Sequence, residues 1–159
     1  MARAGGAQQP YAGEPARQAS QIRKDDPGAR EKIAEALGAF ERLLAVSRDA
    51  DAMGTHHQVR EEPWRDAQEA WERSSARLPP PVKGLRRCAV PLAAARGMIE
   101  RADGLFQQAR AAADPFDAAR MLARHERLLK QAEGSLRRAE RCYRAVRDGY
   151  VKTVSVLRE

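Results

Sequence analysis

The second half of the chain carries the clearest hydrophobic pattern. Apolar or small residues recur there at alternating intervals of three and four positions, in two long series. The first series is Leu85, Cys88, Leu92, Ala95, Ile99, Ala102, Phe106 and Ala109, and the second is Leu122, His125, Leu129, Ala132, Leu136, Ala139, Tyr143, Val146 and Tyr150. Both are coiled-coil heptads with a large residue at position a and mostly alanine at position d. They predict helices over 83–112 and 115–157.

The connection between these two helices is very short. Ala113-Asp114-Pro115 supplies a capping carboxylate followed by proline at the first helical position. Helices joined by so short a link must run antiparallel, and the small d residues let their backbones approach closely. The pattern therefore predicts a long C-terminal helical hairpin. Pro91 indicates either a kink in its first helix or a later start of that helix.

A further apolar position decides between an isolated hairpin and a bundle. The g positions are largely apolar, since they include Met98, Leu105, Leu128 and Cys142. An a/d seam alone serves a two-stranded coil, whereas a, d and g together form the wider face of a bundle helix. We expect this extra flank to be covered by two helices from the first half of the chain.

The first half predicts those two helices, over 27–53 and 63–78. Asp26-Pro27 starts the first one, which carries Ile33, Leu37, Phe40 and Leu44 on one stripe. The second begins at Pro63, places Trp64, Ala67, Trp71 and Leu78 on one face, and ends before Pro79, Pro80 and Pro81.

The predicted fold is thus all-α: an antiparallel bundle of about four helices built on the C-terminal hairpin. Residues 26–159 form the single domain, and residues 1–25, rich in Gly, Pro, Gln and Ala, form a disordered arm. Residues 150–157 are rich in β-branched side chains, which weakens helix propensity. The heptad phase continues through them, so a helix is favoured over a strand or a partner-binding tail.

The charge of the chain is basic and unevenly distributed. The net charge is +7 and the isoelectric point is near 10.0. Residues 79–159 hold 17 Lys and Arg against 9 Asp and Glu, whereas the remainder holds 12 against 13. Such an excess favours an anionic partner, namely nucleic acid, an acidic protein face or an anionic membrane surface. The alternative is a solvated face that keeps the protein in solution.

On the last helix the basic residues are ordered by face. Glu126, Glu133 and Glu140 recur at position e, beside the seam. The basic residues that fall at b, c or f, away from the seam, include Arg124, Arg127, Lys130, Arg137, Arg138, Arg141 and Arg144. We expect most of them to lack an acidic partner and to form a ridge long enough to follow several phosphates. No sequence-specific recognition motif is present, and the choice between DNA and RNA stays open.

Four residues of the hairpin invite a chemical interpretation. Cys88 and Cys142 fall at nearly the same level, although a disulfide needs Cα atoms closer than most helix pairs allow. His125 falls at a core d position opposite Asp103, which predicts a buried His–carboxylate pair. Neither pattern indicates catalysis, and Cys142 and His125 lie too far apart on one helix to act together.

Two further pairs of residues lie in the first half. Trp64 and Trp71 are seven residues apart on one face, where they serve either as core anchors or as exposed partner-binding platforms. His57 and Glu61 share a helical face, but two ligands do not make a metal site.

The sequence contains no phosphate-binding glycine loop, nucleophile elbow or metal-ligand cluster. We therefore predict that the chain is not an enzyme and has no catalytic residue, cofactor, metal or small-molecule substrate. It contains no run of 18 apolar residues and no signal-peptide core, which predicts a cytoplasmic protein without a membrane partner.

These features favour a non-catalytic basic subunit of a larger nucleoprotein assembly, which contacts the nucleic-acid backbone through the arginine ridge. In size, helicity and basicity the chain is similar to the small helical subunits of RNA-guided bacterial defence complexes, a likeness of general character that involves no motif. The alternative is a protein–protein adaptor or a self-assembling structural bundle, phage or secretion-linked, in which the tryptophans make the contacts.

Overall fold

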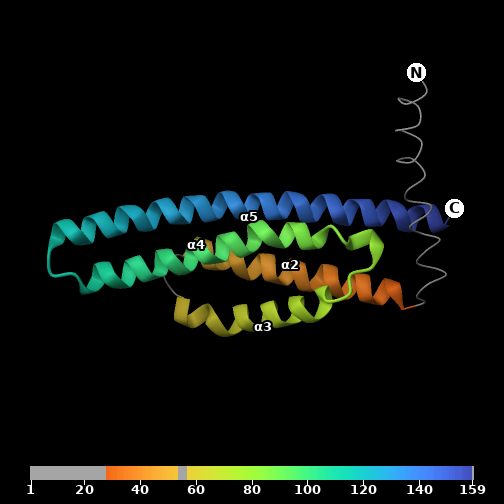
Figure 1. Ribbon diagram of the computed structural model, residues 1–159, viewed down its shortest axis with the longest axis horizontal. Coiled ribbons are helices and arrows are strands. Elements are labelled where there is room, and N and C mark those ends of the chain that lie inside the picture. Colours follow the sequence, from red (N-terminus) through yellow and green to blue (C-terminus); the bar gives the residue numbers. More distant parts are fainter. Residues whose placement is uncertain (1–27, 54–56, 159) are drawn as a thin grey trace, which may run out of the picture.

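The computed structural model describes residues 28–53 and 57–158, with side chains described outside 50–61 and 153–158. The helices are α2 (Ala29–Met53), α3 (His57–Ser75), α4 (Leu85–Ala111) and α5 (Pro115–Arg158), with a short 3-10 turn η1 (Pro80–Val82) before α4. No strand occurs among these described residues. Successive helices run in opposite directions (Figure 1), which confirms the predicted all-α antiparallel bundle. The predicted arm over 1–25 and the helix start at Asp26-Pro27 lie outside the described residues.

The helix boundaries follow the sequence punctuation except where proline lies inside a helix. The prediction that the second helix begins at Pro63 is wrong, because α3 begins at His57 and continues through Pro63. Likewise α4 continues through Pro91, so this helix does not start there. Both prolines lie beyond the first turn, where proline removes a backbone hydrogen bond and its ring crowds the preceding turn, so packing on both sides of each proline must support the helix there. The last helix extends through residue 158, and the strand alternative for 150–157 is wrong.

The α4–α5 hairpin forms as predicted. The Phe116 backbone N–H donates to Asp114 Oδ1 at 3.0 Å, so the aspartate caps α5 where the chain reverses. Ala95 and Ala102 of α4, and Ala132 and Ala139 of α5, are fully buried in the seam. Because these side chains are small, the two helices pack closely over their facing surfaces.

Three aromatic rings join the first two helices to this hairpin. Phe40 of α2 meets the edge of Trp71 of α3 at 5.2 Å between ring centroids and stacks on Tyr143 of α5 at 5.3 Å. The Tyr143 hydroxyl donates to Glu41 Oε2 at 3.1 Å, which adds a polar link between α5 and α2. This aromatic cluster forms the centre of the core.

The loop end of the hairpin extends beyond α2 and α3 (Figure 1). The continuous core reaches Ile99 on α4 and begins at Leu129 on α5. We call residues 100–128, which lie beyond it, the hairpin arm. Leu122 was predicted in the core, and this is wrong: its exposed fraction is 39%, because neither α2 nor α3 reaches the arm there (Figure 1). Phe116, at the tip, is 81% exposed.

The two flanks of the hairpin have different surroundings. We expected α2 and α3 to cover the g positions, but two of their contacts with charged groups of the hairpin lie at the e positions. Arg48 of α2 forms an ion pair with Glu140, and the Arg96 guanidinium lies 5.1 Å from the Trp64 ring centroid of α3. One carboxylate at e, Glu140, thus pairs with a basic group of α2, and this attraction favours docking on that side. No other described helix covers the g flank of the arm.

Candidate nucleic-acid interface

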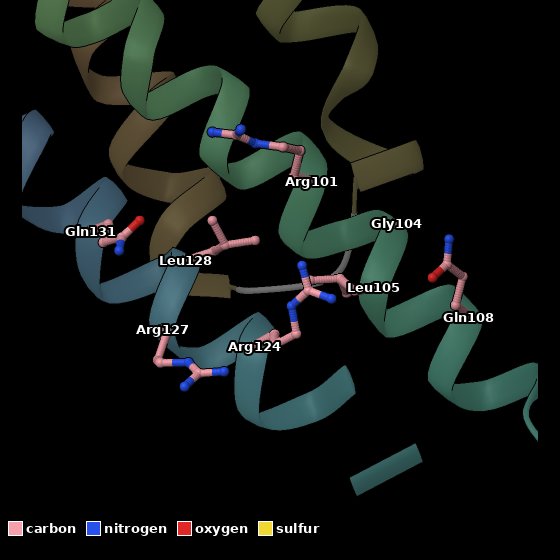
Figure 2. Close-up of a pocket in the computed structure, with 8 residues that line it drawn as sticks. All are labelled: Arg101, Gly104, Leu105, Gln108, Arg124, Arg127, Leu128 and Gln131. Atoms are coloured by element: carbon pink, nitrogen blue, oxygen red, sulfur yellow. The ribbon is translucent and has the colours of Figure 1, made fainter. Parts of the chain in front are cut away.

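A groove of about 510 Å³ lies on the uncovered flank of the hairpin arm. We call it the arm groove. Its lining residues are Arg101, Gly104, Leu105 and Gln108 from α4, and Arg124, Arg127, Leu128 and Gln131 from α5 (Figure 2). All eight occupy c, f or g positions of the predicted heptads. In an antiparallel pair the g flanks of both helices meet, which explains why one concave surface collects them.

The arm groove combines an apolar floor with a basic rim. Leu105 and Leu128, at g positions of the facing helices, are half-buried beside the seam. Figure 2 shows the side chains of Arg124 and Leu128 extending from α5 toward α4. A Cβ added at Gly104 meets nothing within 4 Å, so no neighbouring side chain fills that side.

The electrostatics of the arm groove are one-sided. Arg101, Arg124 and Arg127 are exposed, and within the described part of the chain none of them forms an ion pair. No carboxylate is among the lining residues. Three guanidinium groups around one concavity raise its local positive potential, which attracts phosphate or carboxylate groups.

The predicted arginine ridge is only partly unpaired. Arg137 donates to Glu133 at 2.5 Å and Arg144 donates to Glu140 at 2.6 Å, so the prediction that most of the ridge lacks acidic partners is wrong for these two. Residues four apart on a helix are neighbours, and the glutamates at e reach the arginines one turn later. Arg138 donates to Ser135 Oγ at 2.8 Å instead of to an acid.

The other basic residues of the ridge form no ion pair with a described acidic residue. Arg124 and Arg127 line the arm groove, whereas Lys130 and Arg141 are exposed and form no ion pair with any described residue. Arg138 and Arg141, at c and f, share the heptad face of the groove and continue it toward the body of the bundle. The ridge thus divides between this face and the b positions, where Arg137 and Arg144 are paired and Lys130 is not paired with any described residue.

Glu140 links α5 to α2 on the e flank of the hairpin, away from the arm groove. It forms ion pairs with Arg48 of α2 and with Arg144 of its own helix. The hydrogen bond from Arg48 is the main reason that the pKa of Glu140 is below its ordinary value. Partial burial opposes that effect, and the positive charges of both arginines add to it.

Sequence reasoning missed the contribution of α4 to this site. Arg101, Leu105 and Gln108 of α4 line the groove but were not among the predicted contact residues, all of which lie on the charged face of the last helix or are tryptophans. A signal was present: Arg101 and Gln108 occupy c positions, and in an antiparallel pair the c positions of both helices border the same flank.

His125 lies in the seam, but with a partner other than the one predicted. It is 8% exposed, and its Nδ1–H donates to the backbone carbonyl of Ala102 at 2.7 Å. The predicted His125–Asp103 pair is therefore wrong. Asp103 Oδ1 is buried without a hydrogen-bond partner among the described residues. The imidazole also packs against Phe106, at 5.7 Å between ring centroids.

The two cysteines form a disulfide, which the sequence analysis did not expect. The Cα atoms of Cys88 and Cys142 are 5.3 Å apart, within the range of about 4.4–6.8 Å that a disulfide requires. Their equal level on the hairpin was predicted correctly. The expected separation was too large because the alanine-rich seam brings the two backbones closer than in most helix pairs.

The tryptophans are not available as exposed platforms. Trp64 is 2% exposed and Trp71 is 6% exposed, so the core alternative is confirmed and neither ring is an exposed platform in the single chain. The side chains of His57 and Glu61 lie outside the described ones. Among the described residues there is no group of three or more His, Cys, Asp or Glu placed to hold a metal ion.

The fold and the arm groove together define the class of protein: it is an all-α helical bundle from which a basic helical hairpin projects. No helix among the described residues is both long enough and apolar enough to cross a membrane. No protein-family model, curated protein or solved structure matches the chain. Its function is therefore inferred from its own residues.

Proposed function

We propose that the chain is a non-catalytic subunit of a nucleoprotein assembly, which binds the phosphate backbone of nucleic acid through the arm groove. One observation carries the proposal: three exposed arginines from two helices line one concavity without a carboxylate among its lining residues. Guanidinium groups bind phosphate oxygens in a bidentate manner and are weakly hydrated, which suits them to this contact. Arg141, on the same face of α5, extends the basic surface toward the body of the bundle.

Salt dependence tests the electrostatic part of this proposal. We expect the affinity for a fluorescent oligonucleotide to fall steeply between about 50 and about 200 mM salt, because each neutralised phosphate releases counterions. The measurement is fluorescence anisotropy at several salt concentrations. An affinity that does not change with salt would contradict backbone binding.

Substitution tests the location of the site. The triple variant Arg101→Gln/Arg124→Gln/Arg127→Gln should weaken binding on the order of tenfold or more and lower the logarithmic salt slope by about two. The variant Arg42→Gln/Arg65→Gln/Arg73→Gln removes the same charge from exposed positions of α2 and α3, and it should bind almost as the unchanged chain does. Equal losses in the two variants would show that net charge, not the groove, determines binding.

A protein–protein adaptor is the second candidate function. The observation that favours it is the exposed apolar side chain of Phe116 at the arm tip, together with Val90 at 68% exposure. Aromatic residues are enriched in protein–protein interfaces, and Phe116 lies at the accessible tip of the arm. A chain that binds no oligonucleotide at low salt, yet loses a partner when Phe116 becomes Ser, would establish this role instead.

The compartment stays a prediction. Disulfides persist in oxidising environments and are rare in the cytosol. The Cys88–Cys142 bond therefore favours an oxidising compartment, whereas the proposed nucleic-acid partner favours the cytoplasmic location expected from the sequence. Trapping of free thiols in the native cell, followed by mass analysis, distinguishes the two.

A further inference from the structure

The arm groove contains more than phosphate binding requires. A surface that binds only phosphates needs positive charge and hydrogen-bond donors. The arm groove has these, but its floor also carries Leu105 and Leu128, and its wall carries the amides of Gln108 and Gln131. These side chains come from both helices, so the composition does not reflect a local bias in one segment.

The apolar floor distinguishes between two forms of nucleic acid. In a duplex the base faces are stacked inside, so a duplex offers this surface its phosphates and sugars. In a single strand the base faces are exposed and can lie on apolar side chains or on guanidinium planes. Burial of Leu105 and Leu128 against a base therefore stabilises a single-strand complex and adds nothing to a duplex complex.

The dimensions of the groove agree with this distinction. Its volume of about 510 Å³ lies within the range of about 300–1,000 Å³ typical of sites that enclose small organic molecules. That is room for a nucleotide, not only for a phosphate. Gly104 leaves its side of the groove open, since an added Cβ would meet nothing within 4 Å.

The side-chain amides of Gln108 and Gln131 add hydrogen-bonding groups for the edge of a base to the arginines and the leucine floor. Each amide has both donors and an acceptor, so it pairs with the exposed edge of a base. We infer that the arm groove binds single-stranded nucleic acid in preference to duplex, with the phosphates on Arg101, Arg124 and Arg127 and a base on the leucine floor. This inference rests on the proposed function.

The test compares two ligands and two proteins. The ligands are a labelled single strand of about 20 nucleotides and the blunt duplex of the same sequence, measured by anisotropy at equal salt. The proteins are the unchanged chain and Leu105→Gln/Leu128→Gln, which keeps the charge and uses a residue of similar helix propensity. We expect the unchanged chain to prefer the single strand by about tenfold, and the variant to lose that preference with its duplex affinity unchanged.

A second readout uses the unchanged chain and so does not depend on how well the Leu105→Gln/Leu128→Gln variant folds. A single strand containing the fluorescent base 2-aminopurine, bound to the unchanged chain, should change its emission on binding, because the reporter base leaves its neighbours and enters the groove. In the Arg101→Gln/Arg124→Gln/Arg127→Gln variant this change should vanish together with binding.

Two outcomes would overturn the inference while leaving phosphate binding intact. One is equal affinity of the unchanged chain for single strand and duplex, and the other is an equal loss for both ligands in the leucine variant. If neither ligand binds at low salt, the inference and the proposed function both fail. The two failures are thus distinguishable in one set of titrations.

Discussion

At the scale of single residues, His125 shows how a core position accommodates a polar side chain. The d position places the imidazole in the seam, and the Ala102 carbonyl accepts its Nδ1–H at 2.7 Å. A buried polar group is tolerated when it has such a partner. Asp103 follows Ala102 in the sequence, and its Oδ1 atom is buried without a hydrogen-bond partner among the described residues. His125 therefore stabilises the fold, whereas the buried oxygen of Asp103 destabilises it.

Substitution separates these contributions. His125→Ala should lower the free energy of unfolding by about 1–3 kcal/mol, because it removes a buried hydrogen bond and the packing against Phe106. Asp103→Ala should leave stability unchanged or raise it, because an unsatisfied buried oxygen is removed. Urea unfolding followed by circular dichroism measures both. A large destabilisation by Asp103→Ala would restore the paired arrangement that the sequence suggested.

Glu140 makes stability depend on pH. Its pKa is lowered in the folded state, chiefly by the hydrogen bond from Arg48, so its contribution is complete above the ordinary pKa of 4.5. The contribution is lost as the pH falls through the lowered folded value. We expect the difference in unfolding free energy between the unchanged chain and Glu140→Gln to be below about 1 kcal/mol at neutral pH and to shrink on acidification.

A matched control lies one heptad earlier on the same helix. Glu133 contacts Arg137 of its own helix and is 51% exposed, whereas Glu140 also contacts α2 and is 24% exposed. Glu133→Gln should therefore have a smaller effect at every pH. If both variants behaved alike, the ion pair between α2 and α5 would contribute nothing to stability.

At the scale of elements, the disulfide holds the two helices of the hairpin together near the body of the bundle. Cys88 is fully buried on α4, and the bond joins it to Cys142 of α5 across 54 residues of chain. Such a cross-link stabilises mainly by restricting the unfolded chain. The close approach that permits it depends on the small residues of the seam.

Removal of the disulfide should destabilise the bundle without changing its helix content. Cys88→Ala/Cys142→Ala should lower the free energy of unfolding by about 2–4 kcal/mol. Addition of a reductant to the unchanged chain should have a comparable effect, and addition to the double variant should have none. Thermal unfolding with and without dithiothreitol measures this. Identical stability in both conditions would show that the bond does not form in solution.

The individual helices were largely predictable because their signals are local. The capping aspartate before α5, the three prolines after α3 and the 3-4 spacing act over a few residues each, so the sequence identified all four helices. The error concerns Pro63, which lies inside α3 and not at its start, whereas the predicted helix through Pro91 is confirmed as α4. A proline marks a boundary only when the surrounding packing does not support the helix on both of its sides.

At the scale of the whole molecule, the bundle has a four-helix body and a two-helix arm. The body contains the aromatic cluster and the disulfide, whereas the arm consists of two helices that no other described helix contacts (Figure 1). Buried apolar contacts are thus fewer per residue in the arm. The candidate site lies on the less supported part of the molecule, as is common for binding surfaces.

Amide hydrogen exchange should reveal this division. Residues 100–128 should exchange faster than the parts of α4 and α5 within the body, because local opening of the arm breaks fewer tertiary contacts. Saturating single-stranded oligonucleotide should slow exchange in the arm and leave the body unchanged. Uniform protection along both helices would contradict the division into body and arm.

The sequence by itself determined the helices, the antiparallel hairpin, the alanine seam and the basic excess of the second half, because each depends on residue type at short spacing. The tertiary structure decided which flank α2 and α3 cover, which arginines are paired, that Leu122 lies outside the core, and that Cys88 reaches Cys142. Each of these depends on the relative placement of helices distant in the chain, which the periodicity of one helix does not contain. The arm groove belongs to this second group, since it exists only where two basic helix flanks meet and no third helix covers them.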